Sequence, residues 1–177
     1  MSINYSSIPR VAMVTGAAGS IGSSVVKRLS SEGWKVAGVD LNSGNADLFL
    51  PVDVTDRAAM EEAAARIADE LGPVGLLVTV AGDYKKKSIG NMALARWQRM
   101  LDVWLGGTTN ACSAVVPQMI EAGCGTVVLL SSDLSSYGKQ NTYVAAASGT
   151  VIAFAKASAV KSLLMASALI VWPLGPR

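Results

Sequence analysis

The sequence contains no histidine and only two cysteines, Cys112 and Cys124, which are not spaced as metal ligands. Because histidines and closely spaced cysteines are the side chains that hold transition metals, we expect no metal site. The two cysteines are interpreted as small buried hydrophobic residues in a reducing compartment.

Charge of either sign is also scarce. Lys and Arg number 15 against 13 Asp and Glu, for a net charge of +2, and 16% of residues are charged. This balance indicates neither a nucleic-acid partner nor an anionic membrane surface. Residues Met1 to Pro9 are polar and resemble no signal peptide, and the longest apolar run, Leu163 to Leu174, is too short to span a bilayer. We therefore expect a cytoplasmic protein without a membrane partner.

Apolar residues, by contrast, make up 51% of the 177 residues. A chain of this length and composition can bury a sizeable core and corresponds to one domain. Neither repeats nor linkers are visible, so residues 1-177 are interpreted as a single domain.

A glycine-rich turn stands between a predicted strand and a predicted helix. Val11 to Val14 is a short apolar strand, and a helical pattern runs from the turn to Gly33. Such a turn brings backbone N–H groups and a helix N-terminus against a pyrophosphate. The candidate cofactor-binding residues are Gly16, Ser20, Ile21 and Gly22. An ordinary strand–helix turn is the alternative, and the downstream acid described next favours a dinucleotide.

The second predicted strand, Lys35 to Asp40, ends in that acid, about 20 residues after the glycines. An acid at this point accepts hydrogen bonds from the adenosine ribose hydroxyls and repels a 2′-phosphate, which predicts NAD as cofactor. A turn-forming role is the alternative, because turn-forming residues follow from Asn42.

Strands and helices alternate along the rest of the chain, which predicts an α/β fold with a doubly wound parallel sheet in three αβα layers. The further strands are expected at Leu48 to Thr55, Val74 to Gly82, Thr126 to Ser132 and Ala168 to Trp172. The further helices are expected from Thr55 to Leu71, from Ala95 to Glu121 and from Tyr143 to Ser167.

The run Thr15-Gly-Ala-Ala-Gly-Ser-Ile-Gly22 resembles the Thr-Gly-x-x-x-Gly-x-Gly turn of the short-chain dehydrogenase/reductase family, with Ser20 in place of the second glycine. The resemblance implies a Rossmann-like fold. It also implies that Asp53-Val54 contacts the adenine and that Ala81-Gly82 lies beside the cofactor. A plain strand-end position is the alternative for Asp53.

The resemblance implies a catalytic set as well. Ser132 and Tyr143 match the family's serine, which orients the substrate oxygen, and its tyrosine, which exchanges a proton with that oxygen. The positions of the family's asparagine and lysine hold Trp104 and Ala147. Apart from the resemblance, a serine and a tyrosine near a strand end are more often structural.

Two functions therefore stay open. The first is NAD(H)-dependent hydride transfer between nicotinamide and a small carbonyl or alcohol substrate, with Lys139 or the run Lys85 to Lys87 supplying the missing positive charge. The second is a non-redox, cofactor-binding regulator or scaffold, in which that lysine run is only solvated surface. The resemblance covers about two-thirds of the family domain and omits its C-terminal lid and last strand. An uncovered sixth strand predicts a homo-oligomer.

Overall fold

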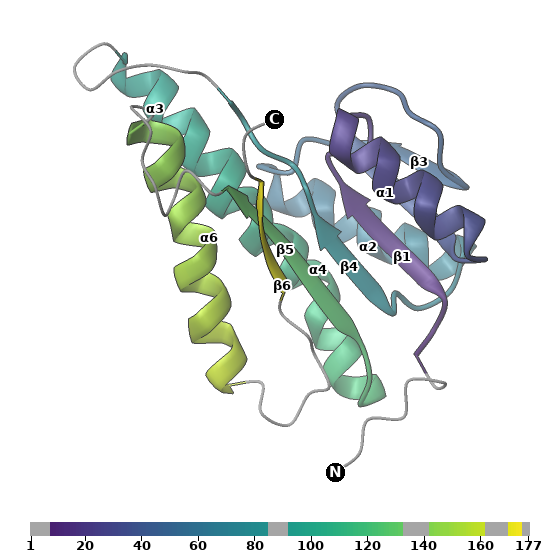
Figure 1. The fold of residues 1–177 in the computed structure, drawn as a ribbon. Helices are drawn as coiled ribbons and strands as arrows, with labels where there is room; N and C mark the ends of the chain where they lie inside the picture. The colour runs from purple at the N-terminus through teal and green to yellow at the C-terminus, as the bar shows by residue number, and fades with distance from the viewer. Residues whose placement is uncertain (1–7, 85–91, 133–141, 162–169, 175–177) are drawn as a thin grey trace.

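The computed structural model describes residues 8–84, 92–132, 142–161 and 170–174 (Figure 1). In these ranges the strands are β1 (Val11–Thr15), β2 (Lys35–Asp40), β3 (Leu48–Pro51), β4 (Leu76–Thr79), β5 (Thr126–Ser132) and β6 (Ile170–Leu174). The α-helices are α1 (Ser20–Ser31), α2 (Arg57–Glu70), α3 (Leu94–Leu101), α4 (Gly107–Ala122) and α6 (Thr142–Lys161), and a π-helical turn, η2 (Asp102–Gly106), joins α3 to α4.

All the strands pair in parallel, in one six-stranded sheet with the order β3-β2-β1-β4-β5-β6. The strand order reverses between β1 and β4, and this switch point is where open α/β sheets bind ligands, beyond the carboxyl ends of the strands. The predicted α/β fold with a doubly wound parallel sheet is therefore confirmed.

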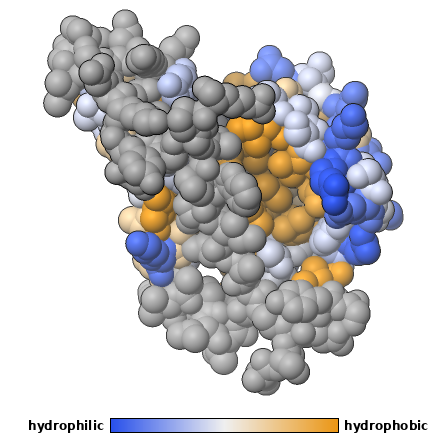
Figure 2. All heavy atoms as spheres, in the orientation of Figure 1, coloured by the Kyte–Doolittle hydropathy of each residue, from blue (hydrophilic) through white to orange (hydrophobic). Residues whose placement is uncertain are grey.

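Helices cover the two faces of the sheet unequally. Met13, Leu77 and Leu129 are fully buried on the face that α2, α4 and α6 cover. On the opposite face α1 covers a smaller apolar cluster that includes Val14 and Val78. Figure 2 shows apolar side chains gathered beside the hydrophilic outer side of α1. No helix among the described residues is long and apolar enough to cross a membrane.

Several element boundaries differ from the expected ones. The third strand stops at Pro51 instead of Thr55, because the chain turns there and Asp53 accepts hydrogen bonds from Thr55. The fourth strand is limited to Leu76–Thr79. The first two residues expected in the sixth strand lie outside the described residues, and that strand is described from Ile170.

The long helix expected from Ala95 to Glu121 is interrupted. Its middle turn, η2, is π-helical and contains Trp104. A π-helical turn inside an α-helix is rare and frequently accompanies a functional site. The helix ends at Gly123, whose φ of +67° is a left-handed conformation that glycine adopts readily.

Candidate functional site

The glycine turn lies at the carboxyl end of β1 and packs tightly against the segment that follows β4. Gly16 has a φ of +67°, and a Cβ added to it would lie 2.7 Å from the backbone nitrogen of Ala81. A Cβ added to Gly22 would lie 2.0 Å from the carbonyl oxygen of Gly16. Both distances are far below van der Waals contact, so the packing of this turn requires glycine at both positions.

Helix α1 begins directly after the turn, at Ser20, with Gly19 as its N-cap residue. No side chain caps this end, and no acidic residue lies in the first turn of the helix. Ser20 is exposed and Ile21 half-buried, so the start of the helix reaches the surface. A helix N-terminus without a side-chain cap presents backbone N–H groups and a partial positive charge, an arrangement that fits a pyrophosphate.

Asp40 ends β2 beside this turn. Its Oδ2 accepts a hydrogen bond from the backbone N–H of Ala18 at 3.1 Å, and its Oδ1 accepts one from the backbone N–H of Asn42 at 3.0 Å. The second contact is a turn-forming hydrogen bond, which agrees with the alternative role that the sequence allowed for Asp40. The first holds the carboxylate against the glycine turn, so the two interpretations of Asp40 are compatible.

Thr15, which begins the glycine-rich run but was not predicted as a site residue, joins the ends of β1 and β4. Its side chain is 1% exposed, and its Oγ1 accepts hydrogen bonds from the backbone N–H groups of Val80 at 3.2 Å and Ala81 at 3.4 Å. The candidate residues Ala81 and Gly82 are thereby placed at the same sheet edge as the glycine turn.

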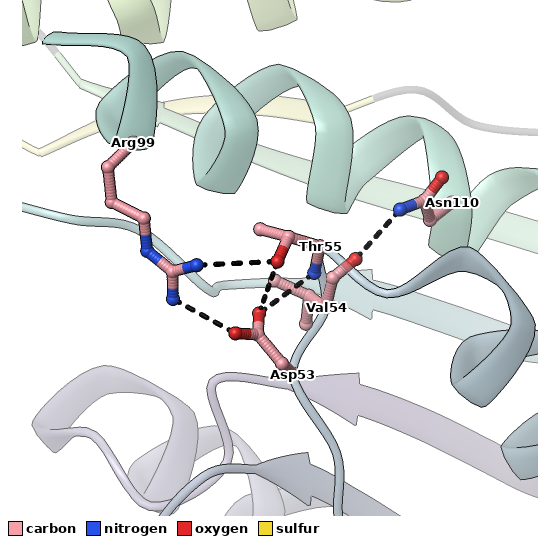
Figure 3. A network of polar contacts seen from close by, with 5 residues as sticks. All are labelled: Asp53, Val54, Thr55, Arg99 and Asn110. Carbon is pink, nitrogen blue, oxygen red and sulfur yellow. Dashed lines mark hydrogen bonds and ion pairs between the residues drawn. The ribbon is translucent and has the colours of Figure 1, made fainter. Parts of the chain in front are cut away.

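Asp53 lies in the connection from β3 to α2, within a polar network (Figure 3). Its Oδ1 accepts hydrogen bonds from the backbone N–H of Thr55 at 2.9 Å and from the hydroxyl of Thr55 at 2.8 Å. Its Oδ2 forms an ion pair with the Nη2 of Arg99 at 3.0 Å. Burial raises the pKa of Asp53, but the hydrogen bonds from Thr55 and the charge of Arg99 outweigh it and hold the pKa below its ordinary value.

Val54, the neighbour of Asp53, is held by helix α4. The side chain of Asn110 donates a hydrogen bond to the carbonyl oxygen of Val54 at 3.0 Å (Figure 3). A Cβ added to Gly107 would lie 2.6 Å from the Cγ2 of Val54. Neither Arg99, in α3, nor Asn110, in α4, could be assigned this role from the sequence, because only the fold brings these two helices to the end of β3.

Trp104 occupies the position of the family's asparagine. Its side chain is buried, and its indole N–H donates a hydrogen bond to the carbonyl oxygen of Asp83 at 3.0 Å. The carboxylate of Asp83 in turn forms an ion pair with Arg96. A Cβ added to Gly82 would lie 2.9 Å from the indole Cζ2, so this glycine makes room for the tryptophan.

The two candidate catalytic residues lie on adjacent elements. Ser132 ends β5, and Tyr143 stands in the first turn of α6, where its ring lies 5.4 Å from that of Trp97. Ala147, one helical turn later, is fully buried. The residues between Ser132 and Thr142 lie outside the described part of the chain. That stretch includes Lys139. The run Lys85 to Lys87 also lies outside the described part of the chain.

The serine that precedes Ser132 fastens this helix to the sheet. The hydroxyl of Ser131 donates a hydrogen bond to the carbonyl oxygen of Ser148 at 2.8 Å, and both residues are fully buried. The hydroxyl of Ser148 donates to the carbonyl oxygen of Val144 at 2.7 Å. The start of α6 is thus held close to the carboxyl end of β5.

Comparison with known proteins identifies the class to which this fold and site belong. A family model described as short chain dehydrogenase matches residues 10–163. The chain therefore belongs to the short-chain dehydrogenase/reductase family, whose members bind a nicotinamide cofactor and act on small molecules.

Among the relatives, D-threitol dehydrogenase of Mycolicibacterium smegmatis is 32% identical over 140 residues, which cover 72% of this chain and 54% of that protein. Acetoacetyl-CoA reductase of Synechocystis is 35% identical over 147 residues, 80% of this chain and 61% of that protein. Ligand-free aldohexose dehydrogenase of Thermoplasma acidophilum superposes with a TM-score of 0.84 at 27% identity, covering 94% of this chain and 68% of that one. The chain thus spans less than two-thirds of the length of the two curated relatives.

Proposed function

We propose that this protein is an NAD(H)-dependent oxidoreductase that transfers hydride between nicotinamide and a small carbonyl or alcohol substrate. The observation that carries the proposal is the contact between Asp40 and the glycine turn, with Oδ2 of Asp40 3.1 Å from the backbone nitrogen of Ala18. It puts a carboxylate next to the uncapped N-terminus of α1, as recognition of an adenosine ribose beside a pyrophosphate requires.

The residues along the carboxyl ends of the strands then have separate roles. Backbone N–H groups from Ser20 to Gly22 bind the pyrophosphate. Asp40 accepts hydrogen bonds from the ribose hydroxyls and repels a 2′-phosphate, so we expect NAD(H) to be preferred to NADP(H). Asp53 and Val54 contact the adenine, while Ala81 and Gly82 line the path toward the nicotinamide.

A bound nicotinamide supplies or accepts the hydride. In this proposal the hydroxyl of Ser132 donates a hydrogen bond to the substrate oxygen, and the phenol of Tyr143 exchanges a proton with the same oxygen. Trp104 takes no part in a proton relay, because an indole N–H only donates and this one already bonds to Asp83. Ala147 supplies no charge. Neither Trp104 nor Ala147 therefore assists proton transfer by Tyr143, and we expect slow turnover.

Calorimetric titration with NADH and NADPH, followed by single-turnover NADH oxidation with a panel of small ketones, tests the proposal. We expect NADH to bind more tightly than NADPH, and Asp40→Ala to narrow that difference. Tighter binding of NADPH to the unaltered protein would contradict the cofactor assignment. Binding of NADH without any turnover would instead identify a non-redox, cofactor-binding protein.

A further inference from the structure

We propose that Arg99 and Asn110 are positioning residues that set the recognition of the adenine base by Asp53. The inference rests on the proposed function and adds to it the device that orients this part of the site. Neither residue lies on the strand–turn–helix unit that carries Asp53; both reach it from the helices on either side of η2.

The hydrogen bonds of Asp53 leave one direction open for a ligand. Each carboxylate oxygen can accept about two hydrogen bonds. Oδ1 already receives two, from the backbone N–H and the hydroxyl of Thr55. Oδ2 receives one, from Arg99. Among the described residues, the remaining acceptor capacity of Asp53 therefore lies on Oδ2, the atom whose direction Arg99 controls.

Arg99 fixes the rotation of this carboxylate. One of its guanidinium nitrogens bonds to Oδ2 of Asp53 at 3.0 Å, and the other lies 3.4 Å from the hydroxyl oxygen of Thr55 (Figure 3). Because that hydroxyl itself bonds to Oδ1, the three side chains close a ring of contacts. A planar guanidinium that bonds at two points restricts rotation in a way that a lysine ammonium does not.

The backbone beside Asp53 is held from the other direction. Asn110 donates to the carbonyl oxygen of Val54 at 3.0 Å, and Gly107 lets α4 approach the Val54 side chain. Asp53 and Val54 are thus held at both the side chain and the backbone. Oδ2 then faces the ligand as a fixed acceptor, which suits the 6-amino group of adenine and disfavours the 6-carbonyl group of hypoxanthine.

The test compares the affinities for NADH and for reduced nicotinamide hypoxanthine dinucleotide, which differ only at the base. We expect the unaltered protein to bind NADH about tenfold more tightly, the effect of one good hydrogen bond to a charged acceptor. Arg99→Ala should reduce that ratio to about two or less, and Asn110→Ala should reduce it partially. The affinity ratio of Arg99→Lys should lie between that of Arg99→Ala and that of the unaltered protein, because lysine keeps the charge but loses the planar contact.

Arg57→Ala is the matched control, because Arg57 also pairs with a carboxylate, that of Glu61, but on the exposed face of α2. It should leave the ratio unchanged. If Arg99→Ala weakened the binding of both dinucleotides equally and left the affinity ratio unchanged, Arg99 would have a merely structural role. That result would overturn this inference but not the proposed function. Failure of the unaltered protein to bind either dinucleotide would overturn the proposed function as well.

Discussion

The indole of Trp104 lies so close to Gly82 that a Cβ on the glycine would come within 2.9 Å of the ring. The resemblance suggested that this glycine lets the backbone approach a cofactor. In the structure its missing side chain makes room for the tryptophan. The π-helical turn η2 carries the ring, and its hydrogen bond to Asp83 fastens the ring to the segment after β4. The bulky ring and the π-helical turn that carries it thus belong to one packing arrangement.

We predict that Gly82→Ala destabilises the protein by about 1–3 kcal/mol, because the added methyl group overpacks against the indole. In a Trp104→Leu background the same substitution should cost much less. Urea denaturation of the four proteins in this double-mutant cycle measures the coupling. Equal costs in both backgrounds would show that the indole does not set the requirement for glycine.

Gly22→Ala should be far more damaging than a glycine substitution elsewhere in a helix. Its Cβ would meet the carbonyl oxygen of Gly16 at 2.0 Å, and a rigid backbone cannot move aside as a flexible side chain can. We expect a loss of more than about 3 kcal/mol of stability together with the loss of NADH binding. Gly106→Ala is the control: nothing lies within 4 Å of its Cβ, so it should be neutral or slightly stabilising.

The lowered pKa of Asp53 makes an acid-sensitive contribution to stability. A carboxyl group whose pKa is lower in the folded state stabilises that state above its unfolded pKa, which is near 3.8. This contribution disappears as the pH falls through the lower pKa of the folded protein. The difference in unfolding free energy between the wild type and Asp53→Asn should therefore be constant from pH 7 to about pH 5 and shrink below pH 4. A difference that grows on acidification would contradict this sign.

Ala147→Lys should increase NADH-dependent ketone reduction in single-turnover experiments. Positions 143 and 147 lie one helical turn apart, so an ammonium at 147 would stabilise a tyrosinate at Tyr143 by Coulomb attraction. Because Ala147 is fully buried, the variant should also lose stability, and Ala147→Met, of similar length without charge, controls for that loss. We expect a gain of about tenfold or more with lysine and none with methionine.

Two further variants locate the effect of that lysine. Adding Trp104→Asn to Ala147→Lys should raise the rate again, because it removes an indole that cannot relay protons. Adding Tyr143→Phe should abolish the gain. A gain that survives Tyr143→Phe would show that the reaction occurs at another place in the protein.

We predict that the protein forms a dimer or a larger homo-oligomer. In the described part of the chain β6 lies at one end of the sheet order, and an uncovered strand edge favours association. Ile120 is an apolar side chain of α4 with 57% of its surface exposed, which a helix-mediated interface would cover. Sedimentation velocity at micromolar concentration should show the assembly, and Ile120→Asp should weaken it. A monomer under these conditions would contradict the prediction.

The parts of the fold that could be predicted are those that depend on residues close together in the sequence. The strand–glycine turn–helix unit from Val11 to Gly33 and the acid at Asp40 follow from local patterns of apolar residues and glycine, and the structure contains them nearly as expected. The sequence predicted one long helix from Ala95 because a π-helical turn adds a single residue per turn and leaves no compositional mark.

The contacts that the sequence could not supply join residues far apart in the chain. Arg99 reaches Asp53, and Trp104 reaches Gly82 and Asp83, only because parallel strands bring their carboxyl ends to one edge. A resemblance could mark position 104 as changed, but it could not show what the indole contacts. The partners of such side chains follow from the strand order and not from spacing.

The packing of the glycine turn against the segment after β4 also determines when this part of the candidate site can form as the chain is synthesised. Gly16 packs against Ala81, and Thr15 bonds to Val80, at a sequence separation of 65 residues. The first strand, turn and helix can associate with β2 early, since those segments are close in the chain. The glycine turn cannot make these contacts until β4 and the segment after it have left the ribosome and β4 has docked beside β1. A nascent chain that stops before β4 should therefore contain the glycine-rich turn in full and still be unable to hold a dinucleotide.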